Sequence, residues 1–372
     1  MRWVRASDTG KGLWLMALAC GLALLAFPQK KKDETQTLQL PRELPPVVEG
    51  DPRRLTFLVT PLSSKGLLSK QVRDALTALS HQAKGDPILK IRAFVAGSGD
   101  ARRVRDLVSE VFTDRKQALP ALSLVQAGGL PLEGAQVELE GVVEVKREVN
   151  PHGLVYISAQ AESAADPNGP VAPLAAKSLA ALRLAVKAAG SEPADVARIS
   201  CFLSSLDDLA ATRRLVEQEY RGAAADFVQT QRTPARSLAA CEAVARLRWS
   251  IGTRLVLMNP EGLAPEPGAS QMALVASPKV VLTGTQVSFG YEEKDARLAF
   301  QRVEKALEQA GVSTRDVAFA HVYALPGGIA GQVRQVRGEF FDGARPPASS
   351  LLLFEGLASM GAGFAMDVVA VK

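Results

Sequence analysis

The sequence predicts an α+β protein that contains three tandem modules, each with the element order β-β-α-β-α-β-β. The 372 residues, 47% of them hydrophobic and 22% charged, have an ordinary globular composition with enough material for two or three domains. A similar order of strand and helix patterns occurs three times, each with a Pro-Ala pair, at Pro120, Pro234 and Pro347. These pairs lie 114 and 113 residues apart, which indicates that one structural unit is repeated.

A short strand is expected upstream of each Pro-Ala pair. The three segments alternate in part between apolar and polar side chains, as expected of a sheet with one covered face. An aromatic residue stands near the end of each segment, at Phe94, Phe202 and Tyr323. The segments cover residues 88–95, 196–203 and 317–324.

Helices are expected on both sides of each of these strands. Apolar residues at three- and four-residue steps, such as Val104, Leu107 and Val108, predict a helix after each strand. A longer helix is expected before each strand, and two of these end in Ala-Gly, at Gly190 and Gly311, which suits a left-handed helix stop. The expected helices cover residues 71–83, 104–112, 173–189, 209–220, 295–310 and 333–341.

The expected domain organisation follows from these patterns. We place a signal peptide or membrane anchor at residues 1–28, a linker at 29–50, and the modules at 51–150, 151–258 and 259–372. Early strands are expected at residues 55–60, 154–160 and 280–285, while the first strand of the first module stays unassigned.

The N-terminus has the layout of an export signal or a short anchor. Arg2, Arg5 and Lys11 precede residues 12–27, which carry no charge. This run is slightly short for a membrane span, which needs about 17–25 residues, and no clean cleavage site follows it. We expect export with the anchor retained, which places the modules outside the cytoplasm, in the periplasm or at the membrane. Residues 29–50 contain charges and prolines without periodicity and are expected to be a tether.

Composition argues against nucleic acid, metal and disulfide frameworks. The net charge of +5 is spread along the chain and aromatic residues make up only 5%, so we expect no nucleic-acid partner. The histidines are isolated, so we expect no metal, and His321 is expected to be packed and hydrogen-bonded. Export would allow a Cys201–Cys241 bridge, but buried free thiols are the preferred interpretation of these two residues.

Several motifs in order resemble the Rid (YjgF-type) family over roughly residues 51–372. The family pattern contains Ser-Gly-Gln, a helix ending in Ala-Ala-Gly, Pro-Ala-Arg-Ser and a last strand with Glu-x-Glu. The matching segments in this chain are Ser158-Ala159-Gln160, Ala188-Ala189-Gly190, Pro234-Ala235-Arg236-Ser237, Val137-Glu138-Leu139-Glu140-Gly141, Thr283-Gly284 and Gln309-Ala310-Gly311.

The resemblance implies the chorismate-mutase-like fold and a trimer with sheets inside, helices outside and ligand clefts between neighbours. It also implies cofactor-free hydrolysis of reactive enamines and imines. An arginine after Pro-Ala would bind the substrate carboxylate, and the first glutamate of Glu-x-Glu would act on the attacking water. Three modules in one chain would form a pseudo-trimer, so we expect a monomer.

The sequence departs from the family pattern at both functional positions. At the arginine position the three modules carry Leu122, Arg236 and Ser349. At the glutamate position the first module keeps Glu138, the second has about Ile251 or Gly252, and the third has Ala365. No module is therefore expected to hold both groups.

These departures favour an array with largely degenerate sites that binds a small carboxylate or imine-type ligand, or a protein partner. The predicted binding residues are Arg236, Ser237, Thr283, Gly284 and Thr285. An active enamine or imine deaminase centred on Arg236 is the first alternative, and a structural or interaction protein at the membrane is the second.

Each candidate residue has a structural interpretation beside the functional one. Glu138 is the candidate catalytic residue, although a solvated strand glutamate would look the same in the sequence. Arg236 would also fit a surface or inter-module salt bridge, and Gly284 a strand end that needs no ligand.

Overall fold

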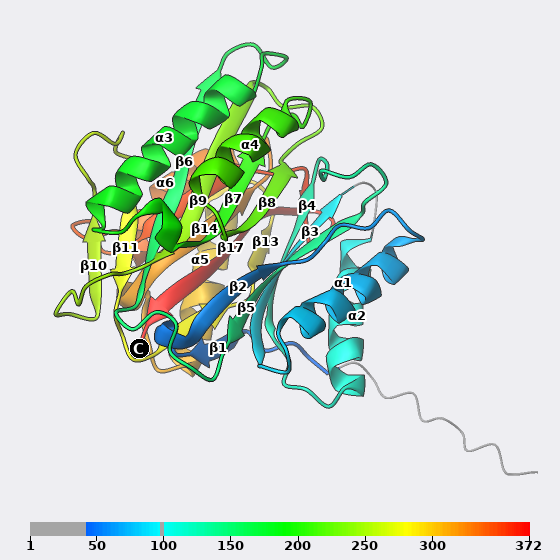
Figure 1. Ribbon diagram of the computed structural model, residues 1–372, viewed down its shortest axis with the longest axis horizontal. Helices are drawn as coiled ribbons and strands as arrows, with labels where there is room; N and C mark the ends of the chain where they lie inside the picture. The colour runs from blue at the N-terminus through cyan, green and yellow to red at the C-terminus, as the bar shows by residue number, and fades with distance from the viewer. Residues whose placement is uncertain (1–41, 97–99) are drawn as a thin grey trace, which may run out of the picture. The chain divides into compact units, whose positions relative to one another are not determined.

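The computed structural model describes residues 42–96 and 100–372 (Figure 1). These residues lie within one compact unit, Pro41–Lys372. The predicted export or anchor segment and residues 29–41 of the predicted linker lie outside the described residues. No helix in the described ranges is long and apolar enough to cross a membrane.

The first sheet belongs to module 1 and carries two helices on one face. Its strand order is β16-β4-β3-β5-β2. The apolar residues of α2 that predicted this helix, including Val104, Leu107 and Val108, are all buried against the sheet. Asp100 accepts a hydrogen bond from the main chain of Arg102 and caps the start of α2. The elements are β2 (Leu55–Val59), α1 (Leu68–Gln82), β3 (Ile88–Ala96), α2 (Ala101–Asp114), β4 (Ala121–Ala127) and β5 (Val137–Glu144).

The second sheet, that of module 2, has the order β10-β11-β6-β9-β7-β8. Gly190 follows α3 with a φ of 71°, the left-handed stop that its position predicted. The elements are β6 (Leu154–Ala164), α3 (Ala172–Ala188), β7 (Val196–Leu203), α4 (Leu209–Glu219), β8 (Ala224–Gln229), β9 (Ser237–Arg246), β10 (Leu255–Met258) and β11 (Met272–Val275).

The third sheet, that of module 3, has the order β1-β12-β17-β14-β15, and β13 also pairs with β17. Gly311 follows α5, again with a φ of 71°. The elements are β1 (Val47–Gly50), β12 (Val280–Thr283), β13 (Gln286–Phe289), α5 (Glu293–Gln309), β14 (Val317–Ala324), α6 (Ile329–Phe340), β15 (Ala348–Leu353) and β17 (Ala362–Val371), while β16 (Gly356–Leu357) of this module belongs to the first sheet.

Some strands pair with a module other than the one in which the sequence places them. Residues 47–50 were assigned to the linker, yet they form β1 and pair antiparallel with β12 of module 3. Residues 272–275 were assigned to module 3, yet they form β11 and pair with β6 of module 2. The short strand β16 of module 3 pairs in turn with β4 of module 1. Main-chain hydrogen bonds therefore connect module 3 to both of the other modules.

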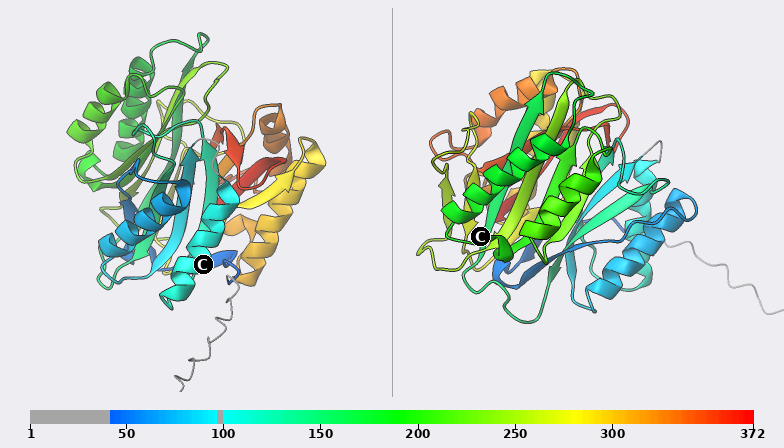
Figure 2. Two further views of the ribbon diagram at one scale, coloured as in Figure 1. Left: turned by 90° about the vertical axis from the view of Figure 1, so that its right-hand side faces the viewer. Right: turned by 45° about the horizontal axis from the view of Figure 1, so that its top comes forward.

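The inner faces of the three sheets share a core, while the helices lie on the outer faces (Figure 2). One inner cluster brings together Phe57, Tyr156 and Phe319, and another brings together Phe94, Phe202 and Tyr323, with members from every module in each. Three further clusters fill the layers between each sheet and its own helices. The predicted fold, with sheets inside and helices outside, is confirmed.

Candidate functional site

Strand register shows which residues of the three modules are equivalent. In each sheet one strand runs parallel to the central strand. These parallel strands are β4, β8 and β15, and they begin at Ala121, Ala224 and Ala348. The three alanines pair with equivalent positions of the central strands β3, β7 and β14. Two of these alanines come from predicted Pro-Ala pairs. The counterpart in module 2 is therefore Ala224, and the assignment of Ala235 to this position is wrong.

The residue after this alanine occupies the family arginine position. It is Leu122 in module 1, Ala225 in module 2 and Ser349 in module 3. Arg236 lies in the loop before β9, one strand later than the sequence comparison placed it. The misassignment arose because module 2 has Ala-Ala at the true position and a Pro-Ala pair just before the next strand.

The structure does not bring Arg236 and Ser237 together with the other predicted binding residues. Arg236 is exposed and lines neither of the inter-module clefts described below. Ser237 is buried, and its hydroxyl donates to the main-chain oxygen of Asp166 in its own module.

The turn formed by Thr283, Gly284 and Thr285 packs against module 1 instead. The N–H of Thr285 donates to the oxygen of Leu122 over 3.0 Å, and its hydroxyl accepts from the N–H of Leu124 over 3.2 Å. A Cβ on Gly284 would lie 2.8 Å from the oxygen of Leu122, so this close approach requires glycine. Thr283 is buried and accepts a hydrogen bond from the main chain of its own sheet.

This turn lines a cleft of about 600 Å³ between modules 3 and 1. Leu122 of module 1 faces the cleft at the family arginine position. The guanidinium-bearing residues of the lining are Arg102, Arg105 and Arg302, and Arg302 donates to the main-chain oxygen of Val287. Gly284 and Thr285 thus lie at an inter-module cleft whose lining residues do not include Arg236.

The glutamate position is occupied by Glu138, Ala240 and Ala365, each paired with the aromatic residue of its central strand. Ala365 agrees with the sequence prediction. The assignment of Ile251 or Gly252 in module 2 is wrong, because both lie in the loop between β9 and β10.

Glu138 lies in a cleft between modules 1 and 2, where β2 approaches β8. Two adjoining hollows of about 750 and about 200 Å³ share the lining residues Leu62, Pro131, Glu138, Arg213 and Ala225. Glu138 is only 4% exposed. Its Oε2 atom has no hydrogen-bond partner among residues 42–96 and 100–372. A buried polar atom without a partner is rare in proteins and calls for an explanation such as a ligand or a catalytic role.

The electrostatic setting keeps Glu138 neutral. Burial and the nearby Glu140 carboxylate raise the pKa of Glu138 to about 8, although Arg213 acts in the opposite direction. Arg213 projects from α4, is exposed, and stacks on Phe227 with its Cζ 5.5 Å from the ring centre. It makes no ion pair within 4.0 Å in the described part of the chain. The cleft therefore combines a protonated carboxyl group with a guanidinium group that is open to an anion.

A network of buried charges lies behind Glu138, where the inner faces of the sheets meet. Arg92 donates to Glu140 over 2.8 and 2.6 Å and to Glu242 over 3.0 Å. Arg198 donates to the same two carboxylates over 3.2 and 2.9 Å. Burial alone would raise the pKa of Glu140, but the two guanidinium groups lower it to about 2. Burial and Glu140 raise the pKa of Asp226 well above its usual range.

His321 is part of this network and bridges two carboxylates. Its Nδ1 lies 3.0 Å from Asp367 and its Nε2 lies 3.0 Å from Glu242. Lys90 and the hydroxyl of Tyr323 also donate to Asp367. The prediction of a packed, hydrogen-bonded His321 is confirmed. The network was not predicted, although charged residues inside otherwise apolar strands are its visible signal in the sequence.

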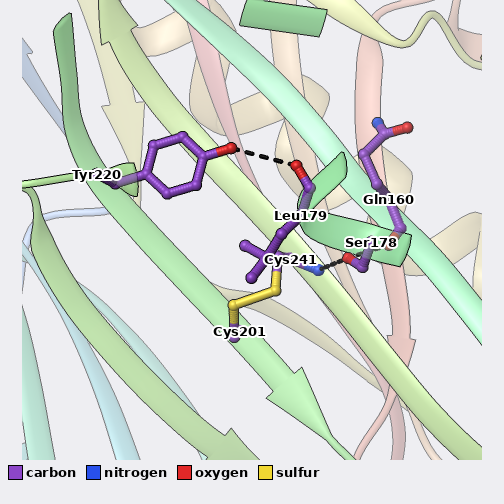
Figure 3. Close-up of a disulfide and its surroundings, with 6 residues drawn as sticks. All are labelled: Gln160, Ser178, Leu179, Cys201, Tyr220 and Cys241. Carbon is purple, nitrogen blue, oxygen red and sulfur yellow. Dashed lines mark hydrogen bonds between the residues drawn. A yellow bond between two sulfur atoms is a disulfide. The ribbon is translucent and has the colours of Figure 1, made fainter. Parts of the chain in front are cut away.

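Cys201 and Cys241 form a disulfide between β7 and β9 (Figure 3). The two residues are directly opposite in an antiparallel pair, with Cα atoms 4.2 Å apart, so the bridge needs no rearrangement of the sheet. Ser178 of α3 accepts from the N–H of Cys241 over 2.9 Å beside the bridge (Figure 3). The preferred interpretation of free thiols is wrong.

The chain was compared with protein families, curated proteins and solved structures. No protein-family model matches the chain, and no curated protein matches it. Solved structures that it resembles include a Rid-family protein of unknown function from Yersinia pestis, with 20% identity over 32% of this chain and 100% of that one, at a TM-score of 0.30.

Two further solved structures have a similar extent. A YjgF-family protein from Mycobacterium tuberculosis shows 22% identity over 32% of this chain and 99% of its own, at a TM-score of 0.24. A putative endoribonuclease L-PSP from Entamoeba histolytica shows 18% identity over the same shares, again at a TM-score of 0.24. The structures that the chain resembles are thus members of the Rid/YjgF family, as the motifs predicted, and each covers about a third of the chain.

Proposed function

We propose that this protein binds a small carboxylate ligand in the cleft between modules 1 and 2, between Glu138 and Arg213. The observation that carries the proposal is the buried Oε2 atom of Glu138, a residue that lines the cleft, because this atom has no partner among the described residues. A ligand carboxylate would accept a hydrogen bond from the neutral acid and pair with the guanidinium group.

The charge pattern favours an anion over a cation in this cleft. With a pKa of about 8, Glu138 carries no charge at neutral pH and offers a donor. Arg213 adds a positive charge whose ring contact with Phe227 holds the guanidinium plane at the cleft margin. A carboxylate accepts hydrogen bonds from both groups, whereas the positive charge of an ammonium ligand would be repelled by Arg213.

Calorimetric titration of the purified full chain with acetate, propionate and pyruvate tests the proposal. A charge-assisted hydrogen bond contributes about 1.5–3 kcal/mol, so Arg213→Ala should weaken binding by about ten- to a hundredfold. Arg236→Ala is the matched control and should leave binding unchanged, because Arg236 lies outside the cleft. Loss of binding in Arg236→Ala with retention in Arg213→Ala would refute the assignment and restore the residue predicted from sequence.

The pH dependence gives a second test of the same site. Affinity should fall about tenfold for each pH unit above the pKa of about 8, since the ligand needs the protonated acid. Glu138→Gln keeps a neutral donor of similar shape and should remove this dependence. Unchanged pH dependence in Glu138→Gln would show that another group binds the ligand.

Hydrolysis of imines is the second candidate function. Glu138 occupies the family glutamate position, faces a cleft, and has a pKa near neutrality, which suits a general acid or base. All three modules lack the family arginine, so we expect slow turnover at most. Rapid imine hydrolysis that is abolished by Glu138→Gln would favour this candidate over simple binding.

We also propose that the modules are exported. The Cys201–Cys241 bridge supports this location, because disulfides persist in oxidising compartments and are rare in the cytosol. A reporter that is active only outside the cytoplasm, fused after Lys372 of the full chain, should be active. A reporter without activity, together with reduced cysteines in the isolated protein, would contradict export.

A further inference from the structure

A small cavity of about 30 Å³ lies among the inner faces of the three sheets. Phe57, Tyr156 and Leu282 line it from modules 1, 2 and 3, and strand register places these three at equivalent positions. Lys90 and Arg198 also line it. One water molecule needs about 10–15 Å³ by this measure, so the cavity has room for one water molecule or one somewhat larger monatomic ion.

Two buried donors of this lining have no protein partner. Arg198 is 7% exposed and Tyr156 is 4% exposed. Within residues 42–96 and 100–372, neither Nε of Arg198 nor the hydroxyl of Tyr156 has a hydrogen-bond partner. The other two nitrogens of the Arg198 guanidinium bind Glu140 and Glu242, so Nε is the donor left over. Unsatisfied buried donors cost about 1–3 kcal/mol each, which calls for an acceptor.

Cationic side chains outnumber acidic ones in the wall of the cavity. Lys90, Arg92 and Arg198 line it, whereas Glu140 is the one acidic residue among the lining residues. The other carboxylates that pair with these three cations, Glu242 and Asp367, are not among the lining residues. The lining therefore favours an anion.

We propose that this cavity binds a halide ion, chloride in the cell, between Nε of Arg198 and the hydroxyl of Tyr156. A halide accepts from both donors, lies beside the three cationic side chains of the lining, and has no hydrogens of its own to place. One O–H group of a water molecule would find the Glu140 carboxylate in the lining, but the other would face walls that include Phe57, Leu282 and Val369. Both donors belong to module 2, and Lys90 of module 1 lies beside the ion.

Crystals of the full chain grown in bromide test the proposal directly. An anomalous bromide peak is expected in the cavity, within hydrogen-bond distance of Arg198 and Tyr156. A peak without anomalous signal at this position would identify water and overturn the proposal.

Halide titration of thermal stability gives the second measurement. At constant ionic strength, replacing sulfate by chloride should raise the unfolding temperature of the parent to a plateau, because a ligand that binds only the folded state stabilises it. Tyr156→Phe should shift the chloride concentration at half effect upward by about tenfold. Tyr220→Phe is the control, since that hydroxyl bonds the oxygen of Leu179 in the outer layer of module 2. An unfolding temperature that does not respond to chloride in the parent would also overturn the proposal.

Discussion

Replacing Glu138 by glutamine should make the protein more stable at alkaline pH. The pKa of Glu138 is about 8 in the folded protein and 4.5 in the unfolded chain. The folded state therefore holds this proton more tightly, so the stability from this group is complete below pH 4.5 and is lost as pH rises through 8. Glutamine has a similar shape and no ionisable proton, so the variant does not lose this contribution to its free energy of unfolding over the same pH interval.

The magnitude follows from the width of this interval. Each pH unit contributes about 1.4 kcal/mol for one proton, so the free energy of unfolding of Glu138→Gln relative to the parent should rise by up to about 5 kcal/mol between pH 4.5 and 8. Glu138 is almost fully buried, which keeps this effect from being screened by solvent. Glu138 is also one cause of the raised pKa of Asp226, so the difference between the two proteins includes a contribution from this neighbour.

Urea unfolding followed by circular dichroism, at one-unit steps from pH 5 to pH 9, measures this difference. Glu217→Gln provides a matched control, because Glu217 lines the same cleft but is exposed. Its effect should stay within about 0.5 kcal/mol at every pH. A constant difference between Glu138→Gln and the parent across the whole range would refute the buried, protonated acid.

Three further substitutions test other parts of the structure. Replacing Cys201 and Cys241 by alanine should lower the free energy of unfolding by about 2–4 kcal/mol, since the bridge closes a loop with a sequence separation of 40. Urea unfolding of the parent with and without reductant checks this value. Glu242→Gln should cost about 3–5 kcal/mol in the same assay, because it leaves buried cations without their partner. Gly284→Ala should cost about 1–3 kcal/mol, since the new Cβ meets the oxygen of Leu122; a melting temperature equal to that of the parent would contradict this contact.

The sequence predicted the elements well because their patterns are local. Apolar residues at helical steps placed α2 within a few residues of its ends, and Ala-Gly placed the stops at Gly190 and Gly311. The partly alternating segments became the central strands β3, β7 and β14. Each of these patterns depends only on which face of an element is buried, and this is visible in a single sequence.

Register and partnership were not predictable in the same way. A Pro-Ala pair looks the same in the sequence whether it precedes the parallel strand or the last strand of a module. The pair before the last strand of module 2 therefore led to the wrong position for Arg236. The pairing of Ala224 with the central strand β7 shows where the parallel strand of module 2 begins. The strands β1 and β11 were assigned to the wrong neighbours for a related reason. Their sequences specify extended structure, but the choice of partner depends on edges formed elsewhere in the chain.

The exchange of strands also bears on why the clefts have diverged. The strands β1, β11 and β16 attach modules to one another by main-chain pairing, which does not use the side chains at the ligand positions. A trimer of identical subunits would change all three clefts with one substitution, whereas one chain with three unlike modules changes them one at a time. Glu138 survives beside Ala225 in one cleft while Leu122 faces another. The observed differences between modules therefore favour one specialised cleft on a shared scaffold. The comparison of Arg213→Ala with Arg236→Ala tests which of the two arginines binds the ligand there.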